Sequence, residues 1–307
     1  MKSKMCVLVL LSAFALGAQN ANTGFFYPAP APDAKRISGV GITEGVLFTG
    51  ALIALQSLWY KNYKHSRFHF FNDNAEWMQM DKAGHAMTAY NLGAVGTDFY
   101  QWSGMKQRQA YWCGGVTGLL FLTIIEMFDG FSSGWGFSGG DMLANVAGSG
   151  LVIGQNLAWN QQRIQIKFSY HQTIYPSYRP DELGTNWAQS IMKDYNGQSY
   201  WLSVNVYSFL DPHADFPHWL NATIGMGADG MITGRKTPSL PNDTTGAHAF
   251  VRSRKLFLSA DVDFTKIQTS DPGAAIFFKT INFIKVPAPA LEYNCVPKKL
   301  KVHPLYF

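Results

Sequence analysis

Residues 81–100 read DKAGHAMTAYNLGAVGTDFY, an apolar stretch with many small residues that predicts a helix of three to six turns. Its first turns carry Asp81 and His85, which stand four positions apart and therefore project from one face of that helix. Ionisable side chains in apolar surroundings are costly unless they are paired. The stretch therefore predicts a polar site at the start of a buried helix.

Two later pairs have the same character. Glu126 and Asp129 stand three positions apart near the end of one apolar run, and Asp141 and Asn145 stand four apart at the start of the next. If the three helices pack together, six hydrogen-bonding side chains converge in one small polar core. A structural role is the favoured interpretation, because carboxylates tied to His85, to Lys82 and to helix N-termini would hold the three helices together.

The part of the chain before residue 163 predicts a bundle of about four apolar helices, over 44–60, 81–100, 106–128 and 140–159. Glycines and alanines recur along these runs and would let the helices approach closely. The uncharged runs 46–60 and 110–125 are shorter than the roughly 20 residues of a comfortable membrane span. Between the first two helices, residues 59–71 interleave aromatic and basic side chains, which fits either a segment at a membrane interface or an aromatic loop over the helical core.

The first 21 residues predict a secretory signal peptide. Lys2 and Lys4 precede an apolar run over 5–16, and small residues follow it. A short membrane anchor is the alternative, although the run is too short to span a bilayer. Cys6 lies inside the run and not at its end, so no lipid anchor is expected. The rest of the chain would then work in an exported compartment, the periplasm or outer membrane of a Gram-negative envelope.

From residue 163 the pattern changes to a period of two. Residues 200–207, 219–229 and 255–264 alternate apolar and polar side chains, and 164–174, 275–286 and 299–307 are expected to be further strands. About six strands predict an antiparallel sheet or partial barrel over 163–307, whose apolar face packs on the helices or on lipid. The fold class is therefore α+β, with a helical part over 22–162 before the β part.

Charge and cysteine content exclude several classes of protein. The net charge is +5 and the pI near 9.0, but the basic residues are scattered, which argues against a nucleic-acid partner. A modest basic excess fits contact with anionic lipid or other envelope components. After signal cleavage only Cys113 and Cys295 remain, which favours two unpaired thiols and gives no zinc-ligand spacing.

Region 59–155, about a third of the chain, resembles the predicted periplasmic lipoproteins of the YfiM type. The resemblance rests on four motifs in matching order and spacing: DKAGH over 81–85, EMFDG over 126–130, GWGFS over 134–138 and DMLANVAG over 141–148. More distantly, the same region looks like the VanZ-like membrane proteins. The resemblance implies an envelope protein but no reaction, and the chain departs from the lipoprotein pattern because it lacks the lipid-accepting cysteine.

Together these features predict a membrane-associated envelope protein with a structural or binding role. The alternative is an envelope enzyme acting on a lipid or cell-wall precursor, with His85 as acid or base and the carboxylates as its orienting groups. In that case His85, Asp81, Glu126 and Asp141 are the candidate ligands of a metal such as zinc, manganese or iron. No glycine-rich nucleotide loop or nucleophile elbow is present, so no organic cofactor is indicated.

Overall fold

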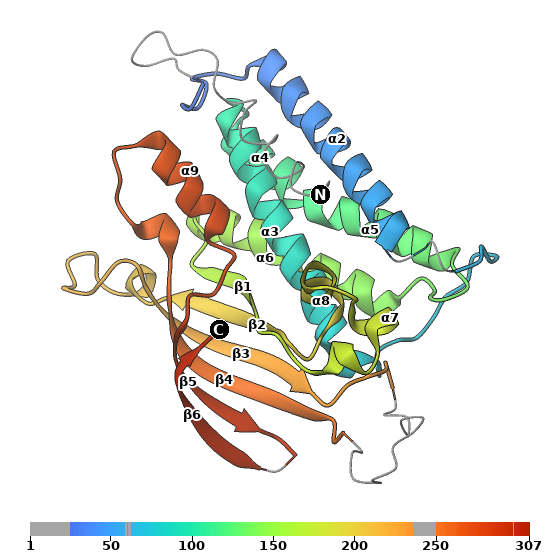
Figure 1. The fold of residues 1–307 in the computed structure, drawn as a ribbon. Helices are drawn as coiled ribbons and strands as arrows, with labels where there is room; N and C mark the ends of the chain where they lie inside the picture. The colour runs from blue at the N-terminus through green and yellow to red at the C-terminus, as the bar shows by residue number, and fades with distance from the viewer. Residues whose placement is uncertain (1–24, 59, 61–62, 236–249, 297) are drawn as a thin grey trace, which may run out of the picture.

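The computed structural model describes residues 25–58, 60, 63–235, 250–296 and 298–307. The expected signal peptide over 1–21 and three residues of the aromatic and basic segment, 59, 61 and 62, lie outside the described residues. Helices and sheet form two layers, with the helical layer above the sheet in Figure 1. The fold is therefore α+β, as the two periodicities predict.

Before residue 160 the described chain forms the helices α2 (Ala34–Leu58), α3 (Met80–Trp102), α4 (Gln107–Gly115), α5 (Thr117–Gly130) and α6 (Gly139–Trp159). The single helix expected over 106–128 is thus two helices, which meet at Val116. Helix α3 lies at the centre of this layer and contacts both α6 and the sheet, whereas α2 lies on the side away from the sheet (Figure 1).

Glycines set the distance between the central helices. A Cβ atom added to Gly114 would lie 2.1 Å from the backbone nitrogen of Thr97 in α3, and one added to Gly118 would lie 2.4 Å from the carbonyl oxygen of Ala89. Only glycine allows backbones to approach this closely, so the sequence-based expectation of tight helix packing is confirmed at these positions.

Two helical stretches are long and apolar enough to cross a membrane, Ala34–Ser57 and Gln107–Gly130, each of 24 residues. The first coincides with α2, and the second combines α4 and α5. Only 6% of the apolar window of the first stretch is buried, against 44% for the second. Helix α2 therefore presents most of its apolar surface to the outside of the protein.

The sheet has six antiparallel strands in chain order, and β1 and β6 do not close it into a barrel. The strands are β1 (Ile164–Tyr170), β2 (Gln198–Asn205), β3 (Leu220–Asp229), β4 (Ser253–Val262), β5 (Ala288–Asn294) and β6 (Lys299–Tyr306). The short helices α7 (Pro180–Leu183) and α8 (Trp187–Lys193) lie between β1 and β2, and α9 (Pro272–Ile281) lies between β4 and β5.

The prediction of a strand over 275–286 was wrong, because most of this segment belongs to helix α9. Asp271 caps that helix by accepting a hydrogen bond from the Ala274 backbone, and Pro272 occupies its first turn, where proline is well tolerated. The missing strand is β5, which the sequence pattern did not indicate.

Both remaining cysteines, Cys113 and Cys295, are free.

The apolar face of the sheet points outward. One row of paired residues crosses five strands, and its members are exposed: Leu202, Ile224, Leu258, Leu291 and Val302. Helix α3 covers one end of this face, where its Met80 packs with Tyr200 of β2 and Ala228 of β3. At the β1 edge, Asn91 and Tyr90 of α3 donate hydrogen bonds to the carbonyls of Ile166 and Ile164. Of the two expected coverings for this face, the helices therefore account for one part.

The opposite face of the sheet is polar and buried. Lys167 forms an ion pair with Asp261 at 2.9 Å, and the Ser203 hydroxyl donates to the same carboxylate at 2.8 Å. The segment after α9 pairs with the β1 edge, because the Lys285 backbone donates a hydrogen bond to the Phe168 carbonyl, and the Lys285 ammonium lies 5.0 Å from the Trp201 ring. At the C-terminus, Tyr306 contacts the ring of Trp201. The interior of the β part is thus a covered polar layer.

Candidate functional site

The six residues singled out by spacing lie at one end of the helical layer. Asp81 and His85 belong to the start of α3, Glu126 and Asp129 to the end of α5, and Asp141 and Asn145 to the start of α6. His85 is the common neighbour. Its Nδ1 lies 3.0 Å from the Asn145 Oδ1, and its Nε2 lies 3.7 Å from the Glu126 Oε1 and 4.0 Å from the Asp81 Oδ1.

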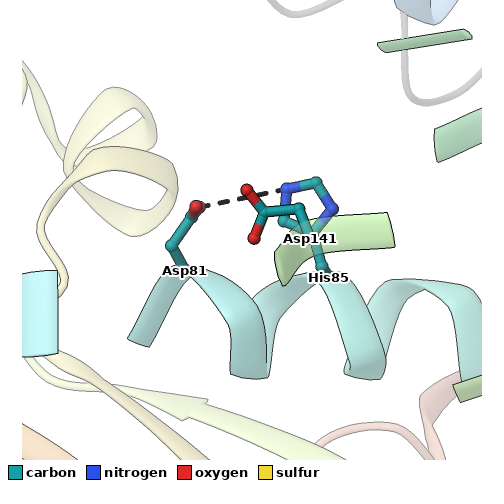
Figure 2. Close-up of side chains that lie close together, drawn as sticks. All are labelled: Asp81, His85 and Asp141. Atoms are coloured by element: carbon teal, nitrogen blue, oxygen red, sulfur yellow. Dashed lines mark ion pairs between the residues drawn. The ribbon is translucent and has the colours of Figure 1, made fainter. Parts of the chain in front are cut away.

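Figure 2 shows Asp81 and His85 one helical turn apart, with the Asp141 carboxyl group beside them. One ligand atom from each of these three residues lies within 4.8 Å of the other two. Asp129 is set slightly apart and accepts a hydrogen bond of 2.6 Å from the Tyr60 hydroxyl. The structure thus brings the predicted residues together around His85.

Lys82 is the cation of the site. Its ammonium lies 2.6 Å from the Asp73 carboxylate, 2.9 Å from that of Asp141 and 3.8 Å from that of Asp81. Asp73 comes from the loop before α3 and was not identified from the sequence, because a single aspartate in a polar loop carries no periodic signal. Burial opposes the ionisation of Asp73, but hydrogen bonds with Asp141, Lys82 and Ser138 lower its pKa. These bonds explain why Asp73 is charged.

Ser138 organises the start of α6. Its hydroxyl accepts a hydrogen bond from the Asp141 backbone, as a helix cap does, and donates one of 2.6 Å to Asp73. Its own backbone N–H donates to the Glu126 Oε2 at 2.9 Å. Ser138 is therefore the N-cap of α6. Because the positive end of α6 faces the carboxylates, it adds to the stabilising field of Lys82.

The β part also reaches the site. Tyr195, just after α8, donates a hydrogen bond of 2.6 Å to the Asp81 carboxylate across 114 positions of sequence. Nothing in the local sequence around Tyr195 indicates this contact, because it depends on how the connection from β1 to β2 folds back on α3. Helical and β parts therefore share one site.

The site holds more negative than positive charge. Five carboxyl groups, those of Asp73, Asp81, Glu126, Asp129 and Asp141, surround one lysine and one histidine. Burial is the main reason that the pKa of Glu126 rises to about 8 and that of Asp141 to about 7. Burial alone would lower the pKa of His85, but the charges of Asp81, Asp141 and Glu126 raise it above its ordinary value.

The site lines a pocket of about 200 Å³. Its polar wall includes Asp73, Asp81, His85, Asp129 and Asp141. Aromatic and apolar side chains form the remaining walls. They come from α2, from α5, from loops at this end of the bundle and from the connection between α8 and β2: Leu55, Tyr60, Phe71, Trp77, Ile125, Trp135 and Tyr195. His85 and the four aspartates therefore border a pocket that can take a small molecule or ion, and Glu126 lies buried behind them.

A larger cavity of about 640 Å³ lies elsewhere, between the end of α6 and the segments beside β2 and β4. Arg163, His218 and Lys266 are among its lining residues. Its walls hold no group of three or more possible metal ligands, so the smaller pocket is the better candidate for chemistry. The ring of His218, in this cavity wall, stacks on Tyr207.

Residues 69–156 match the model of the family described as "Predicted periplasmic lipoprotein (DUF2279)". The matched stretch holds all six predicted site residues together with Asp73, Lys82 and Ser138. No curated protein and no solved structure matches the chain. The match supports an exported location, in the periplasm or the cell envelope. The part of the chain that builds the acidic pocket is thus similar to a family of predicted periplasmic lipoproteins, whose description names no reaction.

Proposed function

We propose that the protein is a membrane-associated component of a Gram-negative cell envelope and that its acidic pocket binds the polar part of a lipid or another envelope component. The observation that carries this proposal is the extent of outward-facing apolar surface. On α2, Ile42, Val46 and Ile53 are exposed. A monomer in water rarely keeps large contiguous apolar patches, so lipid is the natural partner for such a surface.

The sheet contributes a second apolar surface of the same kind. The exposed row from Leu202 to Val302 lies on strands whose opposite side chains are polar and buried, the reverse of a sheet in a water-soluble protein. Exposed Lys299 and Lys301 on β6 alternate with exposed Leu300 and Val302. Bases beside apolar side chains favour contact with anionic headgroups.

Fractionation tests the membrane proposal. We expect the full chain to sediment with membranes, to remain there in a high-salt wash, and to be released by detergent, because the attraction is mainly apolar. Complete release by salt would contradict the proposal.

Replacing Ile224, Leu258 and Val302 together by glutamine should weaken binding to vesicles that contain phosphatidylglycerol. Lys301→Gln, on an exposed neighbouring position, serves as the control and should change mainly the salt dependence of binding.

A second candidate is an enzyme acting on a lipid-linked or cell-wall precursor. It is favoured by the accessibility of His85, since a general acid or base must reach its substrate. Leu55 and Ile125 line the pocket beside the polar wall, so an apolar tail has a path toward the exposed surfaces of α2 and α5. Asp81→Asn should then abolish the cellular phenotype without loss of protein, whereas a drop in abundance would support a purely structural role.

Three statements from the sequence remain predictions. The first is the likeness to YfiM-type lipoproteins and VanZ-like membrane proteins, and the second is the bundle of about four apolar helices. The third is the division of the chain into a signal peptide over 1–21, a helical part over 22–162 and a β part over 163–307. N-terminal sequencing of the mature protein tests the first boundary. We expect a start near Gln19 or Asn22, and an intact Met1 in the membrane fraction would contradict cleavage.

A further inference from the structure

We propose that Asp81, His85 and Asp141 bind one divalent transition-metal cation, with Glu126 as a fourth donor or as a partner of a bound water. The inference rests on the proposed function only in placing the ligand site in this pocket. It can therefore fail while membrane association holds.

The distances from His85 to two of the other donors fit a shared cation, and the Asp81, His85 and Asp141 ligand atoms lie within 4.8 Å of one another. His85 Nε2 lies 4.0 Å from the Asp81 Oδ1 and 3.7 Å from the Glu126 Oε1, both too long for hydrogen bonds. Two atoms that each coordinate one cation at about 2.1 Å lie at most about 4.2 Å apart. The spacing therefore matches a shared cation better than direct contact between the side chains.

The orientation of His85 points to the same use. The Asn145 amide oxygen, 3.0 Å from Nδ1, can only accept a hydrogen bond, so Nδ1 carries the proton. In the neutral imidazole this leaves the lone pair on Nε2, which faces Asp81 and Glu126. A metal-binding histidine is commonly held in this way, with its second ring nitrogen donating to a fixed oxygen.

An independent indication is a buried oxygen without a hydrogen-bond donor. The Glu126 side chain is only 1% exposed, and its Oε1 faces His85 and accepts no hydrogen bond from the described residues. A buried carboxylate oxygen left in this state is costly, and a cation would remove the cost.

The donor set narrows the kind of cation. One imidazole nitrogen with several carboxylate oxygens suits zinc, manganese or ferrous iron, whereas magnesium and calcium prefer oxygen ligands alone. Three protein ligands leave a coordination position toward the pocket, where a water could bind and lose a proton more readily. The chemical class is therefore a metal-activated water beside an aromatic-walled pocket.

Calorimetric titration of the full chain in detergent with Zn²⁺, and separately with Mn²⁺, tests the proposal. We expect one equivalent to bind after chelation and dialysis, and Asp81→Asn and His85→Gln each to weaken binding by about tenfold or more. Asp81→Asn should keep the fold, because an amide oxygen still accepts the Tyr195 hydrogen bond. Asn145→Ala, which removes the oxygen that orients His85, should also weaken binding.

His303→Gln is the matched control, because His303 contacts the Glu292 carboxylate at 2.7 Å without a third ligand. It should bind the metal as the wild type does. Absence of binding by the wild type, or equal binding by the wild type and both pocket variants, would overturn the proposal. Sedimentation with vesicles, measured on the same preparations, tests membrane association separately.

Discussion

Buried charges occur in two regions of this protein and are balanced in only one. Inside the sheet, Lys167 and Lys285 accompany Asp261 and Asp263, and all four are buried. Lys167 and Asp261 form a direct ion pair whose side chains are both 0% exposed. In the pocket at the end of the helices, five carboxyl groups share Lys82 and His85.

The difference indicates two kinds of role. A buried ion pair that is also hydrogen-bonded, such as that between Lys167 of β1 and Asp261 of β4, ties distant strands together, but an excess of one charge stabilises nothing by itself. Such an excess is retained where it serves a ligand, at a cost in stability. We therefore propose a structural role for the charges of the sheet and a binding role for those of the pocket.

The largest expected effect comes from breaking the balanced pair. Lys167→Met leaves the Asp261 carboxylate buried without its cation and should lower the free energy of unfolding by about 3–5 kcal/mol. Chemical denaturation in detergent measures this change. The double variant Lys167→Met/Asp261→Leu should recover most of the loss. A loss below about 1 kcal/mol in the single variant would show that the pair does not stabilise the sheet.

Within the sheet, Lys285 can be compared with Lys167. Its ammonium donates a hydrogen bond to the Val286 carbonyl and lies 5.0 Å from the Trp201 ring. Burial lowers its pKa to about 8, with Lys167 opposing and Asp261 favouring its charge. Below pH 8 the charged form therefore costs stability, and this cost fades as the pH rises toward the unfolded value near 10.5.

Lys285→Met should accordingly raise the free energy of unfolding by about 1–2 kcal/mol at pH 7, with a smaller gain at pH 10. Denaturation curves at both pH values measure it. A loss as large as that of Lys167→Met would mean that the two lysines are equally paired, against the distances observed.

Glu126→Gln gives the smallest expected change. The pKa of Glu126 rises from 4.5 to about 8 on folding, so stability is lost as the pH rises from about 4.5 to 8. With cations chelated, the amide should be nearly neutral at pH 4, where both folded and unfolded chains hold the proton, and stabilising by about 1 kcal/mol at pH 9. The Ser138 N–H keeps an acceptor. A destabilised variant at both pH values would contradict a surplus of negative charge.

Periodicity predicted much of this architecture. The helical pairs Asp81 and His85, and Asp141 and Asn145, converge because their spacing fixes their faces. Alternation predicted most strands, but it could not tell which face is covered. The apolar face is exposed at the row from Leu202 to Val302, whereas polar residues of the opposite face, such as Ser203 and Asp261, are buried.

Contributions from loops could not be predicted. Asp73 and Tyr195 reach the pocket from segments without regular periodicity, and their contacts depend on tertiary packing. Helix α9 replaced an expected strand because the Asp271 cap and Pro272 outweigh an apolar run that fits either structure. The openness of the pocket likewise depends on how the aromatic loops pack, which spacing alone does not specify.

Two isosteric substitutions at equally buried aspartates test the distinction between the regions most directly. Asp141 and Asp261 are 3% and 2% exposed, and each lies 2.9 Å from a lysine. In cation-free protein at pH 7, Asp261→Asn should lower the free energy of unfolding by about 3 kcal/mol or more, because Lys167 loses its partner. Asp141→Asn should leave it unchanged or raise it slightly, because Lys82 keeps Asp73 at 2.6 Å. Equal losses in the two variants would show that the pocket is a structural ion-pair network like the interior of the sheet.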